Sequence, residues 1–289
     1  MLVQDFVTLG TLTSGTGNGG DIILQSNGNL ELNGPILSTD SISGPGNAGN
    51  IELTSTHGNI FMTTGPDIES ENFGSGTVGH ITVTAPAGEI LLSNFDIISG
   101  AIFTHDQGTG GIPGKGGIQI TAKDLTIVNS GIQIDNFSHV QPGDLTVNLT
   151  GHLSLTGTDI TSTLLTTTRR EARSANLNIT AHDILLTGNS LVSTETFRNG
   201  DGGTLNIFAQ NLELTNGAQI RSSSRFNPSP TGSPETPSGA GGTVTIQGLA
   251  DPAGSVMIDG AGSGIFTDTQ GTGAGGDIFV NANSVTLQN

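Results

Sequence analysis

The sequence has no cysteine, no tryptophan and no tyrosine, and phenylalanine occurs only 11 times in 289 residues. The absence of cysteine excludes disulfides, thiolate metal sites and cysteine nucleophiles. With so few aromatic rings, an interior must be filled by isoleucine, leucine and valine, which favours a thin, layered core over a thick one. We therefore expect a narrow, aliphatic interior.

Basic residues are also scarce, since eight Lys and Arg stand against 25 Asp and Glu and give a formal net charge of −17. Nucleic acid and anionic membrane surfaces repel such a chain, so neither is expected as a partner. No apolar run exceeds three residues, whereas a membrane-spanning helix needs about 20, so no transmembrane segment is predicted. The opening residues 1–5 lack the basic and apolar parts of a signal peptide, so no export signal is recognised.

A small residue followed by an aliphatic alternation recurs along the whole chain, which is the mark of a repeat protein. The alternation places a mostly polar residue between two aliphatic ones, as in a half-buried strand. From Ile22 to Ile278 the motif covers 278 − 22 = 256 residues in eight intervals, a period of about 32. The nine copies begin at Ile22, Ile51, Ile81, Ile118, Leu145, Leu177, Leu205, Val244 and Ile278.

Two further alternations, the second in all nine copies and the third in eight of them, predict two more strands. The second strand carries the pairs Leu30/Leu32, Ile60/Met62, Ile90/Leu92, Leu125/Ile127, Leu153/Leu155, Ile184/Leu186, Leu212/Leu214, Val256/Ile258 and Val285/Leu287. The third carries Ile36, Ile68, Ile97, Ile132, Ile160, Leu191, Ile220 and Ile265, and its next inward position holds Ser38, Ser70, Ser99, Ile134, Ser162, Ser193, Ser222 and Thr267. We interpret this hydroxyl column as hydrogen-bonded packing at a corner and not as a catalytic array, because no base recurs beside it.

Three short strands per period, each too narrow to hide its own apolar face, predict one coil of a three-sided solenoid that is stable only when coils stack. Stacked strands lie about 4.8 Å apart, so nine coils would form a rod roughly 40 Å long. The sequence therefore predicts an all-β fold. The expected architecture is a right-handed, single-stranded parallel β-helix of about nine three-strand coils, with residues 1–289 as a single domain.

Length variation is expected on one edge of this prism, between the third strand and the next first strand. The prominent insertions are residues 100–117, 163–175 and 222–241, and the last contains a polyproline-like stretch at residues 227–230. This variable edge is the expected contact surface, although charges also follow loops and solvent. Seven of the eight basic residues are assigned to it: Lys115, Arg169, Arg170, Arg173, Arg198, Arg221 and Arg225.

The pattern Gly-x-Gly-Gly-Asp-Ile-x-Val-x-Ala-x-x-Val-x-Leu at residues 273–287 returns with a longer turn at residues 17–32. It resembles the haemagglutination-activity repeats of filamentous haemagglutinin-like exoproteins, and the resemblance covers essentially the whole chain. The resemblance implies a right-handed parallel β-helix, two-partner secretion through an outer-membrane β-barrel transporter, and a role in adhesion, biofilm formation or contact-dependent competition. The family's amino-terminal secretion domain and its Asn-Pro-Asn-Leu type motif are not found, which predicts an internal segment of a longer shaft.

Carboxylates offer two candidate sites. Asp21 and Asp277 follow glycine pairs, as in calcium-binding nonapeptide repeats, but a period of about 32 argues against calcium. Asp67 and Asp96 both precede a predicted third strand in consecutive coils, which would bring them within about 5 Å, the separation of a retaining glycosidase pair. No lysine or arginine is in register with them, so turn-stabilising hydrogen bonds are the alternative interpretation.

The histidines show no metal-binding spacing such as His-x-x-x-His or Glu-x-x-His, and we interpret them as solvated turn residues. Glycine-rich segments such as residues 108–111 lack the lysine and the helix of a phosphate-binding loop. No catalytic, cofactor-binding or metal site is therefore predicted. The six histidines are His57, His80, His105, His139, His152 and His182.

We expect a structural and adhesive shaft of a secreted or cell-surface bacterial exoprotein, not an enzyme and without a cofactor. Its expected partners are a host, glycan or neighbouring-cell surface, and an outer-membrane transporter during secretion. The alternatives are a passive spacer and a carbohydrate-active β-helix enzyme, a polysaccharide lyase or hydrolase, that uses Asp67 and Asp96. Neither end shows a polar capping coil, so end-to-end self-association is also expected.

Overall fold

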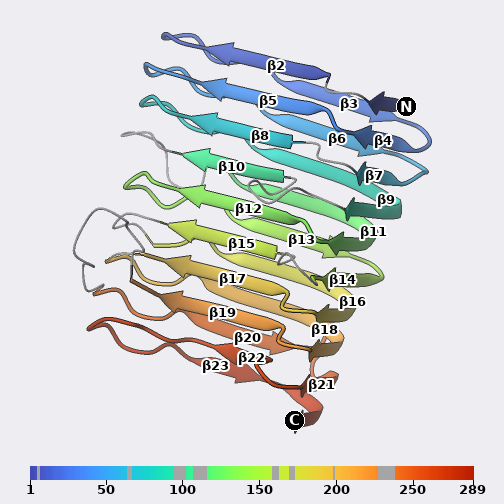
Figure 1. Ribbon diagram of the computed structural model, residues 1–289, viewed down its shortest axis with the longest axis vertical. Coiled ribbons are helices and arrows are strands. Elements are labelled where there is room, and N and C mark those ends of the chain that lie inside the picture. Colours follow the sequence, from blue (N-terminus) through green and yellow to red (C-terminus); the bar gives the residue numbers. More distant parts are fainter. Residues whose placement is uncertain are drawn as a thin grey trace.

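The computed structural model describes residues 1–4, 7–63, 67–93, 102–106, 116–157, 163–168, 173–197, 199–226 and 238–289. These residues form parallel β-strands that stack as coils along one axis, with the two ends of the chain at opposite ends of the stack (Figure 1). The predicted all-β parallel β-helix is confirmed. Within the described residues no helix is long and apolar enough to cross a membrane.

Each coil has a first, a second and a third strand position. The first and second positions belong to one 15-stranded sheet, and four strands run through both without a break: β9 (Ile81–Ser93), β11 (Ile118–Val128), β16 (Leu177–Thr187) and β18 (Thr204–Thr215). The other first-position strands are β3 (Ile22–Ser26), β6 (Ile51–Ser55), β13 (Leu145–Leu149), β20 (Thr243–Gln247) and β23 (Ile278–Val280). The other second-position strands are β1 (Leu2–Gln4), β4 (Leu30–Asn33), β7 (Ile60–Thr63), β14 (His152–Thr156), β21 (Ala253–Asp259) and β24 (Ala282–Gln288).

The third positions form a separate nine-stranded sheet that closes the coil. Its strands are β2 (Thr8–Thr13), β5 (Ile36–Ser41), β8 (Asp67–Asn72), β10 (Ile102–Asp106), β12 (Gly131–Asn136), β15 (Thr163–Thr168), β17 (Leu191–Thr196), β19 (Gln219–Ser224) and β22 (Gly264–Phe266). Eight coils are complete, from β3 to β22, with β1 and β2 before them and β23 and β24 after them. The expected number of nine coils was therefore slightly too high, because the ninth copy of the repeat has no third strand among the described residues.

The first two aliphatic columns are confirmed. Ile22 pairs with Ile51, which pairs with Ile81, and the second-position residues follow the same rule, with Leu30 opposite Ile60. The inward residues of the internal coils are buried, as the burial patterns of alternating strands show. In the second coil, Ile51, Leu53, Ile60 and Met62 are all at most 1% exposed. The core is therefore a continuous aliphatic column along the axis, as the period-two pattern predicts.

The third column was assigned correctly in four coils and wrongly in the others. Ile68, Ile132, Ile220 and Ile265 occupy it, but the inward residues of the first and sixth coils are Leu37 and Val192, not their neighbours Ile36 and Leu191. Where two aliphatic residues are adjacent, the alternation fits either phase, and a shift by one residue turns every side chain to the other face.

In the third and fifth coils the third strand begins later than expected. Ile68 pairs with Ile102 in β10, and Ile132 pairs with Leu164 in β15, whereas Ile97, Ser99, Ile160 and Ser162 lie outside the described residues. The connections between the second and third positions, residues 94–101 and 157–162, are thus longer than those of the other coils. Length variation therefore falls on two edges of the prism and not on one, and the expectation of a single variable edge was wrong.

The inward hydroxyl column exists with a corrected membership. Thr39 and Thr194 occupy it in place of the predicted Ser38 and Ser193, while Ser70 and Ser222 were assigned correctly. Its hydroxyls bond to glycine carbonyls just before first-position strands. Thr39 Oγ1 donates to the carbonyl of Gly49, before β6, at 2.7 Å, and Ser222 Oγ donates to the carbonyl of Gly203, before β18, at 2.7 Å. The column ties two sides of the coil together at a corner, which is a structural role.

Candidate functional site

The predicted pairing of Asp67 with Asp96 depended on placing Ile97 next to Ile68, and this register was wrong because Ile102 takes that place. Asp96 itself lies outside the described residues. Asp67 is the first residue of β8 and pairs with Ile36 of β5.

Asp67 lies instead in a group of four carboxyls on the outer face of β5 and β8, which we call the acidic cluster: Asp40, Asp67, Glu69 and Glu71. Across the two strands, Asp40 is opposite Glu71 and Ser38 is opposite Glu69. Oxygen atoms of Asp40, Glu69 and Glu71 lie within 4.8 Å of one another. The Ser38 hydroxyl donates to Asp40 Oδ2 at 2.5 Å, while Asp40 Oδ1 and Asp67 Oδ1 are buried without a hydrogen-bond partner.

All four carboxyls of the acidic cluster have raised pKa values. Burial is the main cause, and it raises the pKa of Asp67 to about 6 and that of Asp40 in the same direction. Burial and then repulsion from neighbouring carboxylates raise the pKa of Glu69 to about 8 and that of Glu71 to about 7. Near neutral pH the cluster therefore holds protonated and ionised carboxyls side by side.

This arrangement has two chemical capacities. A protonated carboxyl beside an ionised one can give a proton to a leaving group while its neighbour accepts one or attacks. Three oxygen ligands within a few ångströms of one another also suit a hard cation such as Ca²⁺. Among the described residues, no Lys or Arg forms an ion pair with the acidic cluster, so like-charge repulsion is relieved by proton uptake.

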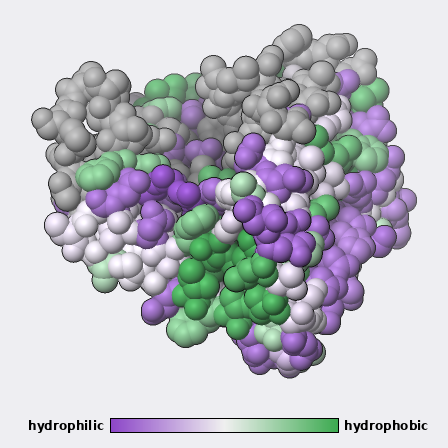
Figure 2. Space-filling model, turned by 60° about the horizontal axis from the view of Figure 1, so that its bottom comes forward, coloured by the Kyte–Doolittle hydropathy of each residue, from purple (hydrophilic) through white to green (hydrophobic). Residues whose placement is uncertain are grey.

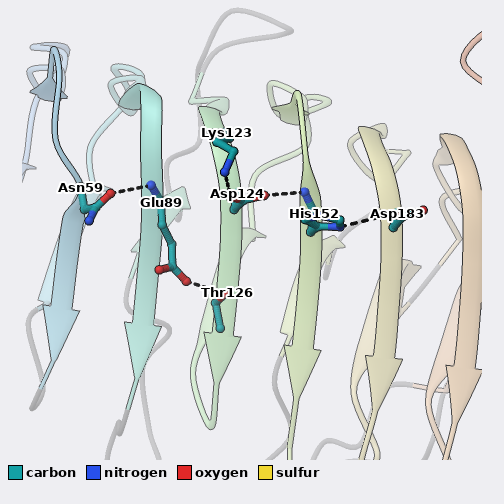
Figure 3. A network of polar contacts seen from close by, with 7 residues as sticks. All are labelled: Asn59, Glu89, Lys123, Asp124, Thr126, His152 and Asp183. Carbon is teal, nitrogen blue, oxygen red and sulfur yellow. Dashed lines mark hydrogen bonds and ion pairs between the residues drawn. The ribbon is translucent and has the colours of Figure 1, made fainter.

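A second polar network runs along the corner between the first and second positions (Figure 3). Asn59 Oδ1 accepts the backbone N–H of Glu89 at 2.9 Å, and the Thr126 hydroxyl donates to Glu89 Oε1 at 2.7 Å. Further along the axis, Asp124 Oδ1 accepts the backbone N–H of His152 at 2.8 Å. Each bond joins one coil to the next, so the network braces the stack.

Two histidines of this corner share one carboxylate, which the interpretation as isolated turn residues did not anticipate. His152 Nδ1 lies 3.2 Å and His182 Nδ1 lies 3.0 Å from Asp183 Oδ2, and the histidine side chains are 65% and 54% exposed. The hydrogen bond from Asn211 lowers the pKa of Asp183, and His182 and His152 lower it further. The two histidine side chains are solvated as expected; His152 and Asn211 contact Asp183 from the neighbouring coils, and His182 contacts it within its own coil.

At the Gly-Asp corners, side-chain oxygens accept hydrogen bonds from the next coil. Asp21 Oδ1 accepts the backbone N–H of Asn50 at 2.7 Å, and Asn50 Oδ1 accepts the backbone N–H of His80 at 2.9 Å. The same ladder recurs where Asp144 Oδ1 accepts the backbone N–H of Asn176 at 3.1 Å. These oxygens satisfy backbone donors of the next coil, as in turn-stabilising side-chain bonds and not as in a calcium loop.

Three of the four described basic residues make contacts between coils, whereas Lys123 pairs with Asp124 next to it in β11. Arg173 donates to the Thr204 hydroxyl at 2.9 Å, and Arg225 pairs with Glu195 at 3.1 Å. Arg221 lies within β19 and stacks on the ring of Phe266 at 4.9 Å, so its assignment to the variable segment was wrong. The four others assigned to that segment, Lys115, Arg169, Arg170 and Arg198, lie outside the described residues.

A shallow depression of about 310 Å³ crosses the outer face of the first-position strands of three consecutive coils. Its polar lining comes from β9, β11 and β13 and includes the outward residues Thr82, Gln119 and Thr146. His80 and Asp144 contribute at its rim from the preceding corners.

Comparison with known proteins identifies no relative. No protein-family model, no curated protein and no solved structure matches this chain. A function must therefore be inferred from the fold and from the geometry of the side chains.

The sequence did not predict the acidic cluster because the inward residues of the third strand in the first coil were assigned one position too early. With Leu37 in place of Ile36 as the partner of Ile68, Asp40 faces Glu71 across the sheet. Three carboxyls at alternate positions of Asp67–Asn72 were the available signal, since alternate residues of a strand share one face.

Proposed function

We propose that this chain is a structural and adhesive shaft of a secreted or cell-surface bacterial exoprotein. The observation that carries the proposal is the pairing of equivalent residues in one coil after another through all eight complete coils. Such a stack multiplies any outward side chain into a row along the axis, which favours weak contacts made many times over. The resemblance to haemagglutination-activity repeats supports the same role and an export route through an outer-membrane transporter.

The depression on the first-position face is the contact surface that we assign to adhesion. Thr82, Gln119 and Thr146 present hydroxyl and amide groups from three stacked coils, and the described lining contains no lysine or arginine that would select for phosphate. A row of neutral donors and acceptors suits the hydroxyls of a surface glycan.

The test is attachment of beads coated with the full chain to glycan-coated surfaces and to bacterial cells. We expect the variant Gln119→Ala/Thr146→Ala to lose most of the attachment, whereas the matched variant Asn178→Ala/Thr245→Ala, on the same outward column but outside the depression, keeps it. Full attachment by the first variant would contradict the assigned surface. Failure of the unaltered chain to attach at all would favour the passive spacer.

The second candidate function is a carbohydrate-active enzyme, a lyase or hydrolase of polysaccharides. The close approach of Asp40, Glu69 and Glu71 favours it, and these residues replace the predicted pair of Asp67 and Asp96 as its centre. Turnover of a polysaccharide by the full chain that is abolished in Glu69→Gln and kept in Glu213→Gln would establish the enzyme and displace the adhesive shaft.

A further inference from the structure

Two histidines from neighbouring coils meet at one carboxylate. His152 begins β14 in the fifth coil, whereas His182 and Asp183 are consecutive residues of β16 in the sixth coil. The register places His152 opposite Asp183, so one step along the stack joins residues that lie 183 − 152 = 31 positions apart in the chain. Spacings such as His-x-x-x-His report only ligands that are close in the chain, so the sequence did not reveal this group.

The backbone fixes where the two rings start. The N–H groups of His182 and Asp183 both donate to the carbonyl oxygen of Gly151, at 2.7 and 3.4 Å. Gly151 immediately precedes His152, so both histidines are anchored at the same place. Neighbouring strands of a sheet lie about 4.8 Å apart, which lets two imidazoles reach one atom. Rotation about the side-chain bonds is therefore the main freedom that remains to the rings.

Both imidazoles direct a nitrogen at the same oxygen atom. His152 Nδ1 lies 3.2 Å from Asp183 Oδ2 (Figure 3), and His182 Nδ1 lies 3.0 Å from it. Metal bonds of about 2.0–2.2 Å to a nitrogen and an oxygen that meet at a right angle leave those two atoms about 3 Å apart. The observed separations therefore match those of neighbouring ligands on one metal ion. Each neutral ring with its proton on Nε2 can offer the Nδ1 lone pair to such an ion.

The second oxygen of the carboxylate is held from the other side. Asn211, in β18 of the seventh coil, donates from Nδ2 to Asp183 Oδ1 at 2.7 Å. Ligating carboxylates are commonly hydrogen-bonded by such outer partners, which orient them. The bond keeps Asp183 Oδ2 turned toward the histidines. Three consecutive coils therefore contribute: the fifth supplies one ligand, the sixth supplies two, and the seventh supplies the donor that orients the carboxylate.

The surroundings attract a cation and leave it room. Glu89 and Asp124 precede His152 along the same column, so carboxylates lie on both sides of this imidazole. Lys123 pairs with Asp124 at 3.2 Å and offsets one of these charges. The side chains of His152 and His182 are 65% and 54% exposed, so the rings can turn and water can occupy the remaining positions of an ion. Figure 2 shows hydrophilic residues along the side of the molecule where this corner lies, on the right in Figures 1 and 2.

The donor set selects the class of metal. Imidazole nitrogen suits Zn²⁺, Cu²⁺ and Ni²⁺, whereas Ca²⁺ and Mg²⁺ take oxygen ligands. Ligands that meet at right angles are typical of tetragonal Cu²⁺ and Ni²⁺ sites, and Zn²⁺ prefers a tetrahedron. For a given set of nitrogen and oxygen ligands, Cu²⁺ binds most tightly of these ions. The group therefore fits Cu²⁺ best and differs in this respect from the acidic cluster, whose oxygen ligands suit a hard cation.

We propose that His152, His182 and Asp183 bind a divalent transition-metal ion, Cu²⁺ in preference to others, through both Nδ1 atoms and Oδ2. The ion replaces the direct contacts among the three side chains and joins the fifth coil to the sixth. An ion that binds only the stacked coils also stabilises them against unfolding. The site is separate from the surface assigned to adhesion, so loss of metal binding and loss of attachment are separate outcomes.

The first experiment titrates the full chain with Cu²⁺ by isothermal titration calorimetry. We expect one tight site per chain, whose affinity falls about tenfold or more in His152→Ala and in His182→Ala, and less in Asp183→Asn, which keeps an oxygen ligand but removes its charge. His57→Ala and Glu69→Gln are the controls for an isolated exposed histidine and for the acidic cluster, and both should keep the tight site. Unchanged affinity in His152→Ala or His182→Ala, or loss of the tight site in either control, would overturn the assignment.

Electron paramagnetic resonance identifies the ligands. Spectra of the full chain with less than one equivalent of Cu²⁺ should show splitting from two nitrogens, and from one nitrogen in His182→Ala. Cu²⁺ should also raise the melting temperature and slow hydrogen exchange at the backbone N–H of His182, and removal of the ion with EDTA should reverse both effects. Splitting from fewer than two nitrogens, or exchange at His182 that Cu²⁺ does not change, would refute a metal bridge between the coils.

Discussion

A β-carbon on Gly79 would lie 1.8 Å from the carbonyl oxygen of Gly49 in the preceding coil. The same relation holds between Gly49 and Gly20, where the distance would be 1.9 Å, and between Gly276 and Gly242, where it would be 1.8 Å. Real side chains cannot approach a backbone oxygen so closely, so glycine at this corner lets the backbones of neighbouring coils meet. The small residue before each first strand is therefore a packing requirement of the stack.

Substitution of this corner glycine should damage the fold. We expect Gly79→Ala to lower the free energy of unfolding by about 2–4 kcal/mol, because two buried backbone segments must move apart. Gly17→Ala is the matched control, since a β-carbon there meets nothing within 4 Å, and it should be close to neutral. Urea denaturation measures the free energy of unfolding of both variants. Equal stability of the two would show that neighbouring coils can move apart at this corner without loss of stability.

The acidic cluster should make the protein less stable at high pH. The pKa values of Glu69 and Glu71 are raised in the folded state from 4.5 to about 8 and about 7, so the folded chain holds protons that the unfolded chain has released. The stability that comes from protonation of these two carboxyls is fully present below about pH 4.5. It is lost as the pH rises through their pKa values in the folded state. Melting temperatures measured from pH 5 to pH 9 should therefore fall, other groups being constant.

Glu69→Gln should flatten that fall and make the protein more stable at pH 9 than the unaltered chain. The gain should be on the order of 1 kcal/mol, since the group is partly solvated and screened. Glu31→Gln, at an exposed position of β4, is the control and should keep the original pH profile. A profile unchanged by Glu69→Gln would mean that the cluster is ionised in the folded state.

The side-chain ladder at the corners should contribute modestly and locally. Asn50 Nδ2 donates to Asp21 Oδ1 at 3.1 Å, and Asn50 Oδ1 accepts the backbone N–H of His80. Because these groups are exposed, we expect Asn50→Ala to lower the free energy of unfolding by about 1 kcal/mol and to speed hydrogen exchange at His80. Asn283→Ala, in the terminal strand β24, should leave both quantities unchanged. A loss of stability above about 3 kcal/mol would show that the ladder contributes more free energy than solvent-exposed hydrogen bonds do.

The coils should be modular. Leu177 pairs with Leu145 on one side and with Leu205 on the other, so deletion of residues 177–204 brings Leu205 beside Leu145 with every column preserved. The shortened chain should fold cooperatively into a rod about 4.8 Å shorter. Deletion of residues 177–190 would instead place a third-position strand beside β13 and should abolish the native circular dichroism and cooperative melting. Small-angle scattering measures the length, and failure of the whole-coil deletion to fold would contradict independent coils.

The first and second strand positions could be predicted because their evidence is local and repeated. In Leu30–Asn33 and Ile51–Ser55 the aliphatic residues alternate with polar ones, so only one phase buries the apolar side. Nine copies of the same pattern then fix the period, because an error in one copy conflicts with its neighbours. This reasoning was sufficient for the fold class and for most of the core.

The acidic cluster and the lengths of the connections could not be predicted from the sequence, and the reason is physical. Ile36–Leu37 and Leu191–Val192 offer two phases of equal hydrophobicity, and the choice between them is made by the register with the coil on either side. That choice determines whether Asp40 lies opposite Glu71 or opposite Asn72, and hence whether carboxyls repel one another and take up protons.

The amino-acid sequence alone determined that the chain winds into stacked parallel coils, because glycine corners and aliphatic alternation at a constant period admit no other burial of the apolar side chains. Only the tertiary structure decided which outward side chains share a surface, since those neighbours lie about one period apart in the chain and are selected by a register of single residues. For this reason the parallel β-helix was predictable, whereas the acidic cluster emerged only from the stacked coils.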